Sequence, residues 1–208
     1  ADIKAYQPEN HSISQGQVLS CPYSWEKGKL IVREMTELLV LDLVRKGLLT
    51  DQMVLTIGYD QSGVPANFSG KLIRDRYGKK IPKQAHGSIN LEKQTSSGRK
   101  IVAAVMQLYD KIVDPLLSIR RMYVVANRVI AESDAVEMPV QYSLFEDVVV
   151  KEQEAAQEKE SREREYSLQK AMLSIQDKFG KNAILKGMNL QEGATTVQRN
   201  EQVGGHKA

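Results

Sequence analysis

The sequence predicts an α+β domain in which two helices cover one face of a four-stranded sheet. Two observations lead to this fold class. Four segments have the alternating pattern of strands, and two segments between them repeat apolar residues at helical spacing. Their chain order is strand, helix, strand, strand, helix, strand, which is the split βαβ pattern. Both helices then lie on the same side, and the other face of the sheet is left open.

The first half of the domain supplies a strand, a helix and a second strand. Residues 12–19 alternate loosely, with Ile13 and Leu19 on one face. Ser24 can cap the helix that follows, because its side chain can accept a bond from a backbone N–H of the first turn. Residues 53–59 then alternate again and predict the second strand.

The second half supplies the remaining strand, helix and strand. Residues 86–95 alternate, with polar side chains on one side. Ser96 or Ser97 can cap the second helix, whose apolar residues form one stripe. Residues 120–129 are rich in β-branched residues and predict the last strand. The pattern leaves open which face of this strand points inward.

A long insertion separates the second and third strands. Residues 61–85 contain glycine and proline without strong periodicity, so we expect a long loop or a flexible hairpin extension. The insertion holds six Lys and Arg against one Asp. It is either a solvated loop or a basic arm that reaches along a phosphate backbone. The basic residues selected as candidate DNA contacts are Lys71, Arg74, Lys79 and Lys80.

Composition limits the class of protein and its partners. Hydrophobic residues make up 41% of the 208, the mean hydropathy is −0.39, and no apolar run reaches the roughly 18 residues that span a bilayer. The only cysteine, Cys21, excludes an intramolecular disulfide and fits a reducing cytoplasm. Residues 1–130 hold 19 Lys and Arg against 12 Asp and Glu, whereas residues 131–208 hold 10 against 14. A basic first part suggests a polyanionic partner, although ordinary solvated surfaces also carry such an excess.

No constellation of residues predicts catalysis within this chain. The three histidines are isolated in the sequence, and no cysteine pair accompanies them, so we expect no metal site. The aspartates near strand and helix ends do not form the paired carboxylates that a two-metal phosphoryl-transfer site needs. No nucleophile signature or phosphate-binding glycine loop is present.

The character of the chain changes after the sheet domain. Residues 131–149 form an acidic linker, and residues 150–180 predict a long charged helix. We expect this helix to be solvated in its first half. One stripe should dock the second half: Leu168, Met172, Ile175 and Phe179. Residues 181–208 are polar and without periodicity, so we expect a flexible tail.

Polar side chains on the first and third strands are the candidate contacts of the open face. Serine, asparagine and glutamine side chains, with strand amides, could donate to phosphates without reading bases. The alternative is an ordinary solvated surface. The residues selected on this ground are Ser12, Ser14, Gln15, Ser88 and Asn90.

Residues 11–19 (HSISQGQVL), the element order after them and the closing strand resemble the little-finger domain of Y-family translesion DNA polymerases. The ImpB/MucB/SamB or UmuC-like branch is the most similar, and residues 179–208 resemble the tail of its Gram-positive members. The resemblance implies that residues 12–130 are a little finger and residues 1–11 a linker.

In that family the little finger lies on duplex DNA and contacts mainly phosphates, while preceding palm, fingers and thumb hold the nucleotide and two metal ions. The resemblance therefore implies Mg²⁺ for a catalytic core outside this chain, and no cofactor within it. Carried over to this sequence, backbone contacts fall on residues 12–17 and 86–94, which adds Gln17 and His86 to the candidates. The insertion at 61–85 is longer than the family pattern, so its role stays open.

The linker contains a second resemblance. Residues 141–145 (QYSLF) are similar to the pentapeptide with which bacterial polymerases bind the sliding clamp, although Tyr142 departs at the second position. Gln141 could anchor through its amide, and Leu144 with Phe145 could fill an apolar pocket on the clamp. Alternatively, these two apolar residues pack the linker back onto the sheet domain.

Two function hypotheses follow. The first is the C-terminal fragment of an error-prone, cytoplasmic DNA-repair polymerase of the SOS response. Its partners would be damaged or primed duplex DNA, the sliding clamp and its own N-terminal catalytic core, with no membrane. The second is a non-catalytic interaction adaptor of ferredoxin-like fold with a helical tail. Binding of DNA that weakens steeply with salt would distinguish the first from the second.

Overall fold

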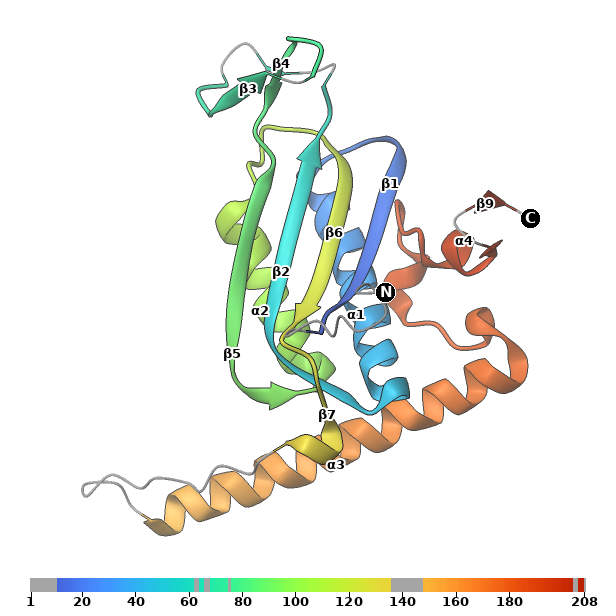
Figure 1. Ribbon diagram of the computed structural model, residues 1–208. Coiled ribbons are helices and arrows are strands. Elements are labelled where there is room, and N and C mark those ends of the chain that lie inside the picture. Colours follow the sequence, from blue (N-terminus) through green and yellow to red (C-terminus); the bar gives the residue numbers. More distant parts are fainter. Residues whose placement is uncertain are drawn as a thin grey trace, which may run out of the picture.

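The computed structural model describes residues 11–61, 64–65, 68–74, 76–135, 148–203 and 206–207. Four long strands and two helices form the domain (Figure 1). In chain order they are β1 (Ile13–Tyr23), α1 (Trp25–Lys46), β2 (Leu48–Tyr59), β5 (Ala85–Thr95), α2 (Gly98–Ile112) and β6 (Ile119–Asn127).

The sheet has the order β1-β6-β2-β5, and every neighbouring pair is antiparallel. β6 therefore lies between β1 and β2, which α1 connects, and β2 lies between β5 and β6, which α2 connects. These are two interleaved split βαβ units, so the predicted fold class is confirmed. Both helices cover the same face of the sheet (Figure 1). A short strand, β7 (Ile130–Ala131), pairs with the beginning of β2.

Local signals set the helix ends as expected. The Ser24 hydroxyl accepts a bond from the Lys27 N–H, and Gly47 closes α1 in the left-handed conformation with φ of 62°. Of the two serines proposed for the second cap, Ser97 takes the role, and its side chain accepts from the Lys100 N–H.

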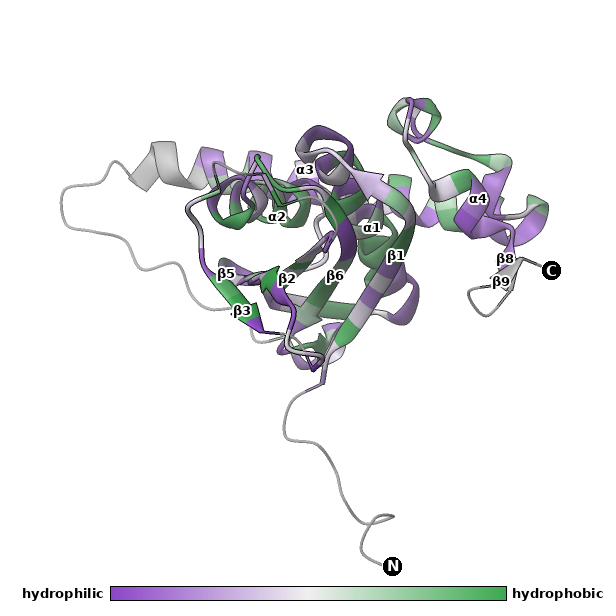
Figure 2. Cartoon of the chain, turned by 90° about the horizontal axis from the view of Figure 1, so that it is seen from above, coloured by the Kyte–Doolittle hydropathy of each residue, from purple (hydrophilic) through white to green (hydrophobic). Residues whose placement is uncertain are grey.

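The core lies between the sheet and the two helices, where apolar residues are concentrated (Figure 2). It also decides the orientation of β6: Met122, Val124 and Ala126 are fully buried against the helices. The alternating residues Arg121 and Tyr123 are exposed on the other face.

The insertion forms a hairpin of β3 (Leu72–Arg74) and β4 (Lys80–Pro82). It projects from the end of the sheet that lies away from α3 (Figure 1). Of the two forms expected for this insertion, a loop or a hairpin extension, the structure has the hairpin.

The long charged helix is confirmed as α3 (Val148–Phe179), but its expected docking stripe is wrong. Leu168 and Phe179 are 62% and 68% exposed, whereas Gln169 and Leu173 are buried. The helix packs across the N-terminus of α2, where the Glu165 carboxylate accepts bonds from the Ser97 hydroxyl and the Arg99 N–H at 2.6 and 2.9 Å. The position of α3 against α2 is therefore set by the polar contacts of Glu165.

The expectation of a flexible tail is wrong for residues 181–200. They form short helical turns, Lys181–Ala183, Gly187–Leu190 and α4 (Thr196–Asn200), that pack beside α1 and β1 (Figure 1). A short strand pair, β8 (Gln202–Val203) and β9 (His206–Lys207), follows.

A buried carboxylate on α1 explains the order of the tail. Glu34 is 1% exposed, and it accepts bonds from the Asn189 amide and the Thr195 N–H, both at 2.8 Å. An ionised carboxylate in this position needs such donors, because leaving it buried without them is unfavourable. None of the helices described here combines the length and the apolar character that crossing a membrane requires.

Candidate nucleic-acid interface

The open face of the sheet is a grid of rows, each formed by residues directly opposite one another on neighbouring strands. One row joins Ser14, Val125, Val54 and Ser88, and the next joins Gly16, Tyr123, Thr56 and His86. The structure thus brings the predicted residues of two strands 70 positions apart onto one surface. The candidates that are exposed there are Ser12, Ser14, His86, Ser88 and Asn90.

Gln15 and Gln17 do not belong to this surface, so their expected place on it is wrong. Strand residues alternate, and these two share the helix-covered face with Ile13 and Leu19. The Gln15 amide nitrogen donates to Asp42 Oδ2 at 2.9 Å, and its oxygen accepts from Arg199 at 3.1 Å. Gln17 exchanges hydrogen bonds with the Thr195 hydroxyl. The alternation with Ile13 and Leu19 already contained this signal.

A row of amides crosses the open face between β6 and β5. The Asn127 amide donates to Gln52 Oε1, and the Gln52 amide donates to Asn90 Oδ1, both at 2.8 Å. Arg128 also donates to Asn90 Oδ1 at 2.8 Å and forms an ion pair with Asp51 at 2.9 Å. The Asn90 oxygen already accepts two hydrogen bonds. The amide nitrogen of Asn90 is therefore the atom that can donate a hydrogen bond to a ligand.

His86 is held by a neighbour in its row. Thr56 Oγ1 lies 2.8 Å from His86 Nδ1. This bond orients the ring and leaves Nε2 as the nitrogen that can meet a ligand.

Two residues that the sequence did not single out contribute large side chains to the open face. The Tyr123 ring, 42% exposed, lies 2.8 Å from where a Cβ on Gly16 would be. The stem of Arg121 lies over Gly58 in the same way, at 2.4 Å. Each glycine therefore makes room for the large side chain beside it. Glycines inside two predicted strands were the available signal, because such glycines often mark a close approach.

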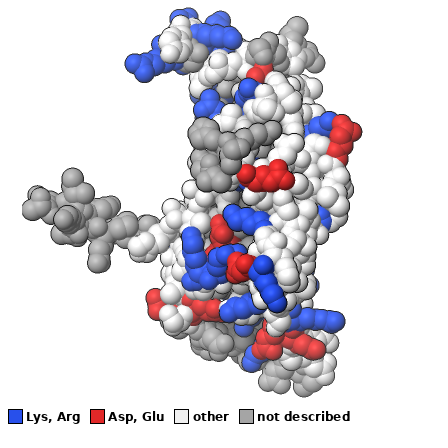
Figure 3. All heavy atoms as spheres, turned by 90° about the vertical axis from the view of Figure 1, so that its right-hand side faces the viewer, with Lys and Arg blue, Asp and Glu red and all other residues white. Residues whose placement is uncertain are grey.

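Basic residues gather on the hairpin at the end of this face (Figure 3). The hairpin carries all four of the predicted basic contacts. All four are exposed: Lys71, Arg74, Lys79 and Lys80. Together with Arg121 they place positive charge at one end of the grid.

The predicted clamp-binding residues Gln141, Leu144 and Phe145 lie outside the described residues. They fall in the sequence between Ala135 and the start of α3.

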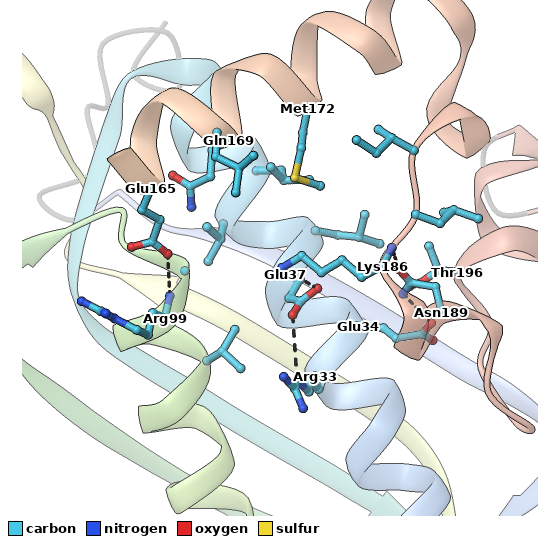
Figure 4. A pocket seen from close by; sticks show the side chains of 18 of the residues that line it. Arg33, Glu34, Glu37, Arg99, Glu165, Gln169, Met172, Lys186, Asn189 and Thr196 are labelled. Atoms are coloured by element: carbon cyan, nitrogen blue, oxygen red, sulfur yellow. Dashed lines mark hydrogen bonds and ion pairs between the residues drawn. The ribbon is translucent and has the colours of Figure 1, made fainter. Parts of the chain in front are cut away.

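The opposite, helical side carries a pocket of about 530 Å³ between α1, α2, α3 and the tail (Figure 4). Its lining combines aliphatic side chains with charged and amide groups, and Glu37 lies 3.9 Å from Arg33 and 3.1 Å from Lys186. Across the described part of the chain, no group of three or more His, Cys, Asp or Glu is arranged to hold a metal ion. The pocket therefore combines aliphatic volume with charged groups that pair with one another.

The model of the impB/mucB/samB family C-terminal domain matches residues 10–143. Among solved structures, the little finger domain of PolIV, in complex with the beta-clamp processivity factor, is similar at 12% identity and a TM-score of 0.38, covering 65% of this chain and 100% of that one. A search of curated proteins gave no match. Since the family model spans more than half of the sequence, the chain belongs to the impB/mucB/samB family of Y-family polymerases and carries its C-terminal domain.

Proposed function

We propose that this chain grips damaged or primed duplex DNA and tethers an error-prone translesion polymerase to the sliding clamp. Nucleotidyl transfer then belongs to a catalytic core outside this chain, which also holds Mg²⁺. The setting is the cytoplasmic response to DNA damage. The observation that carries the proposal is the open face of a family little finger, where neutral donors lie in register and Arg121 adds a cation at the hairpin end.

The chemistry of this face suits phosphates. Ser14, Ser88 and the Asn90 amide offer neutral donors, and Arg121 offers a cation at the hairpin end of the grid. Such contacts position a duplex without reading its bases, so binding should be independent of sequence. Each cation that meets a phosphate releases condensed counterions, so affinity should fall as salt rises.

The tether is assigned to Gln141, Leu144 and Phe145 from the sequence motif. A short peptide binds through a few buried side chains, and an apolar pair with a two-sided amide supplies such anchors. A polymerase that contacts DNA mainly through phosphates gains from a second attachment, because linking two weak sites raises the effective concentration of each.

The test uses fluorescence anisotropy of the whole chain with a primed duplex over a range of salt concentrations. The variant Arg121→Gln should weaken binding for every sequence tested and reduce the salt slope by about one contact. Lys111→Gln is the matched control, because it removes one exposed charge from α2 on the opposite side. No binding by the parent chain at low salt would contradict the proposal and favour an interaction adaptor.

A further inference from the structure

We propose that the β3–β4 hairpin binds single-stranded DNA, with an unpaired base stacked on Tyr77 and neighbouring phosphates held by the hairpin's lysines and arginines. This inference rests on the proposed function, since it assumes DNA as the partner. The inference goes further in two respects: it specifies that the hairpin binds single-stranded DNA, and it names Tyr77 as the residue on which a base stacks.

The hairpin presents its turn away from the rest of the domain. Pairing runs from Leu72 opposite Pro82 to Arg74 opposite Lys80, so Tyr77 lies near the middle of the turn. Gly78 takes a φ of 80°, which a side chain would disfavour, and this allows the chain to reverse there. The turn therefore points beyond the end of the sheet (Figure 1).

Two cations of the hairpin lie opposite each other across its strands. Arg74 and Lys80 are directly opposite and exposed, and like charges in that position disfavour pairing. Among the described residues, no carboxylate lies within ion-pair distance of either. Lys71 and Lys83 are joined by a backbone bond of 2.9 Å and are exposed as well. A polyanion would relieve this repulsion.

An exposed aromatic ring at the turn points to an unpaired base. The Tyr77 side chain is 91% exposed, and Leu72 and Ile73 behind it are 41% and 38% exposed. Proteins that bind single strands combine a basic surface with aromatic rings on which bases stack. Bases within a duplex are already stacked on each other, so a base can stack on this ring only where a strand is unpaired.

Continuity with the sheet favours DNA over an acidic protein. The hairpin joins the end of β2 to the start of β5, and Arg121 lies opposite Gly58 at that end of the open face. A duplex held on the sheet would carry its unpaired strand past this end, within reach of the hairpin.

The experiment measures the affinity of the full chain for three probes: a blunt duplex, the same duplex with a single-stranded overhang, and oligo-dT. Tyr77→Leu should weaken binding to the overhang and to oligo-dT by at least about fivefold, the effect of losing one stacked base. Blunt-duplex affinity should stay within about twofold. Tyr77→Phe keeps a ring and should retain affinity. Phe179→Leu, which removes an exposed ring from α3, is the matched control.

A direct readout is ultraviolet crosslinking of an overhang that contains 5-iodouracil, with the attachment site located by mass spectrometry. Crosslinking at Tyr77 supports the inference. The inference would be overturned if Tyr77→Leu lost affinity equally for all three probes, or if the overhang gave the parent chain no gain in affinity over the blunt duplex. The proposed binding of duplex DNA would stand in either case. Polyglutamate that competes as well as oligo-dT would point to an acidic protein and also overturn it. A parent chain that binds no probe would instead refute the proposed function.

Discussion

The two faces of one sheet use similar polar residues for different purposes. On β1, Ser14 faces the open side, while its neighbour Gln15 faces the helices and bonds to Asp42 and Arg199. The covered face is closed by the tail, which Glu34 holds by charged hydrogen bonds. The open face keeps donors and cations at the surface. A polar side chain in a strand is therefore no guide to function until its face is known.

The same contrast separates the tail from the hairpin. The tail buries Asn189 and Thr195 with Glu34 as their partner, and burial lowers the pKa of the Arg199 guanidinium, an effect that Glu34 opposes. The hairpin exposes like charges directly opposite each other. The tail is built for internal cohesion, and the hairpin is suited to an external polyanion.

The largest effect is expected for the clamp-binding motif of the linker. Leu144→Ala with Phe145→Ala should abolish binding to the bacterial sliding clamp, because two apolar anchors contribute about 2 kcal/mol or more each. Surface plasmon resonance with immobilised clamp measures this. Duplex affinity and melting temperature should be unchanged. A much lower melting temperature would mean that these residues pack in the core.

Glu34→Ala should destabilise the covered face. It removes the acceptor of three hydrogen bonds that include a charged group, and the loss should be about 2–3 kcal/mol. Denaturant unfolding measures it, and limited proteolysis should cut residues 181–200 first. Glu26→Ala, which removes an exposed carboxylate from the first turn of the same helix, is the control. An uncleaved tail would show that other contacts hold it.

Reversal of three hairpin charges should weaken DNA binding and leave the packing of the covered face unchanged. Lys71, Lys79 and Lys80 changed together to Glu should weaken DNA binding more than tenfold for all sequences, and should flatten its salt dependence by about three contacts. Anisotropy titrations at several salt concentrations measure both quantities. An unchanged salt slope would make the hairpin an ordinary solvated surface.

The smallest expected effect on DNA affinity tests whether the covered and open faces of the sheet have separate roles. Gln15→Ala with Gln17→Ala should leave duplex affinity unchanged, because both side chains bond to the helix side and the tail. Thermal melting should show a modest loss. Ser14→Ala with Ser88→Ala is the complementary variant, expected to lower affinity without lowering the melting temperature. Weaker DNA binding by the glutamine variant would break the comparison.

The element order, the α+β class and both helix caps were predictable because they depend on residues close in sequence. Ser24 and Ser97 each cap a backbone N–H three residues away, and strand alternation has a period of two. The same local pattern identified Ser14, Ser88 and Asn90 as polar strand residues.

Tertiary structure decided what those residues meet. Gln15 bonds to Arg199, and Glu34 to Asn189 and Thr195, across more than 150 positions of sequence. The exposure of Arg121 and Tyr123 depends on which side of β6 the two helices pack. The docking register of α3 depends on the position of Ser97 at the start of α2. Sequence periodicity sets which residues share a face, but only contacts between distant segments determine which face is buried and which polar groups become partners.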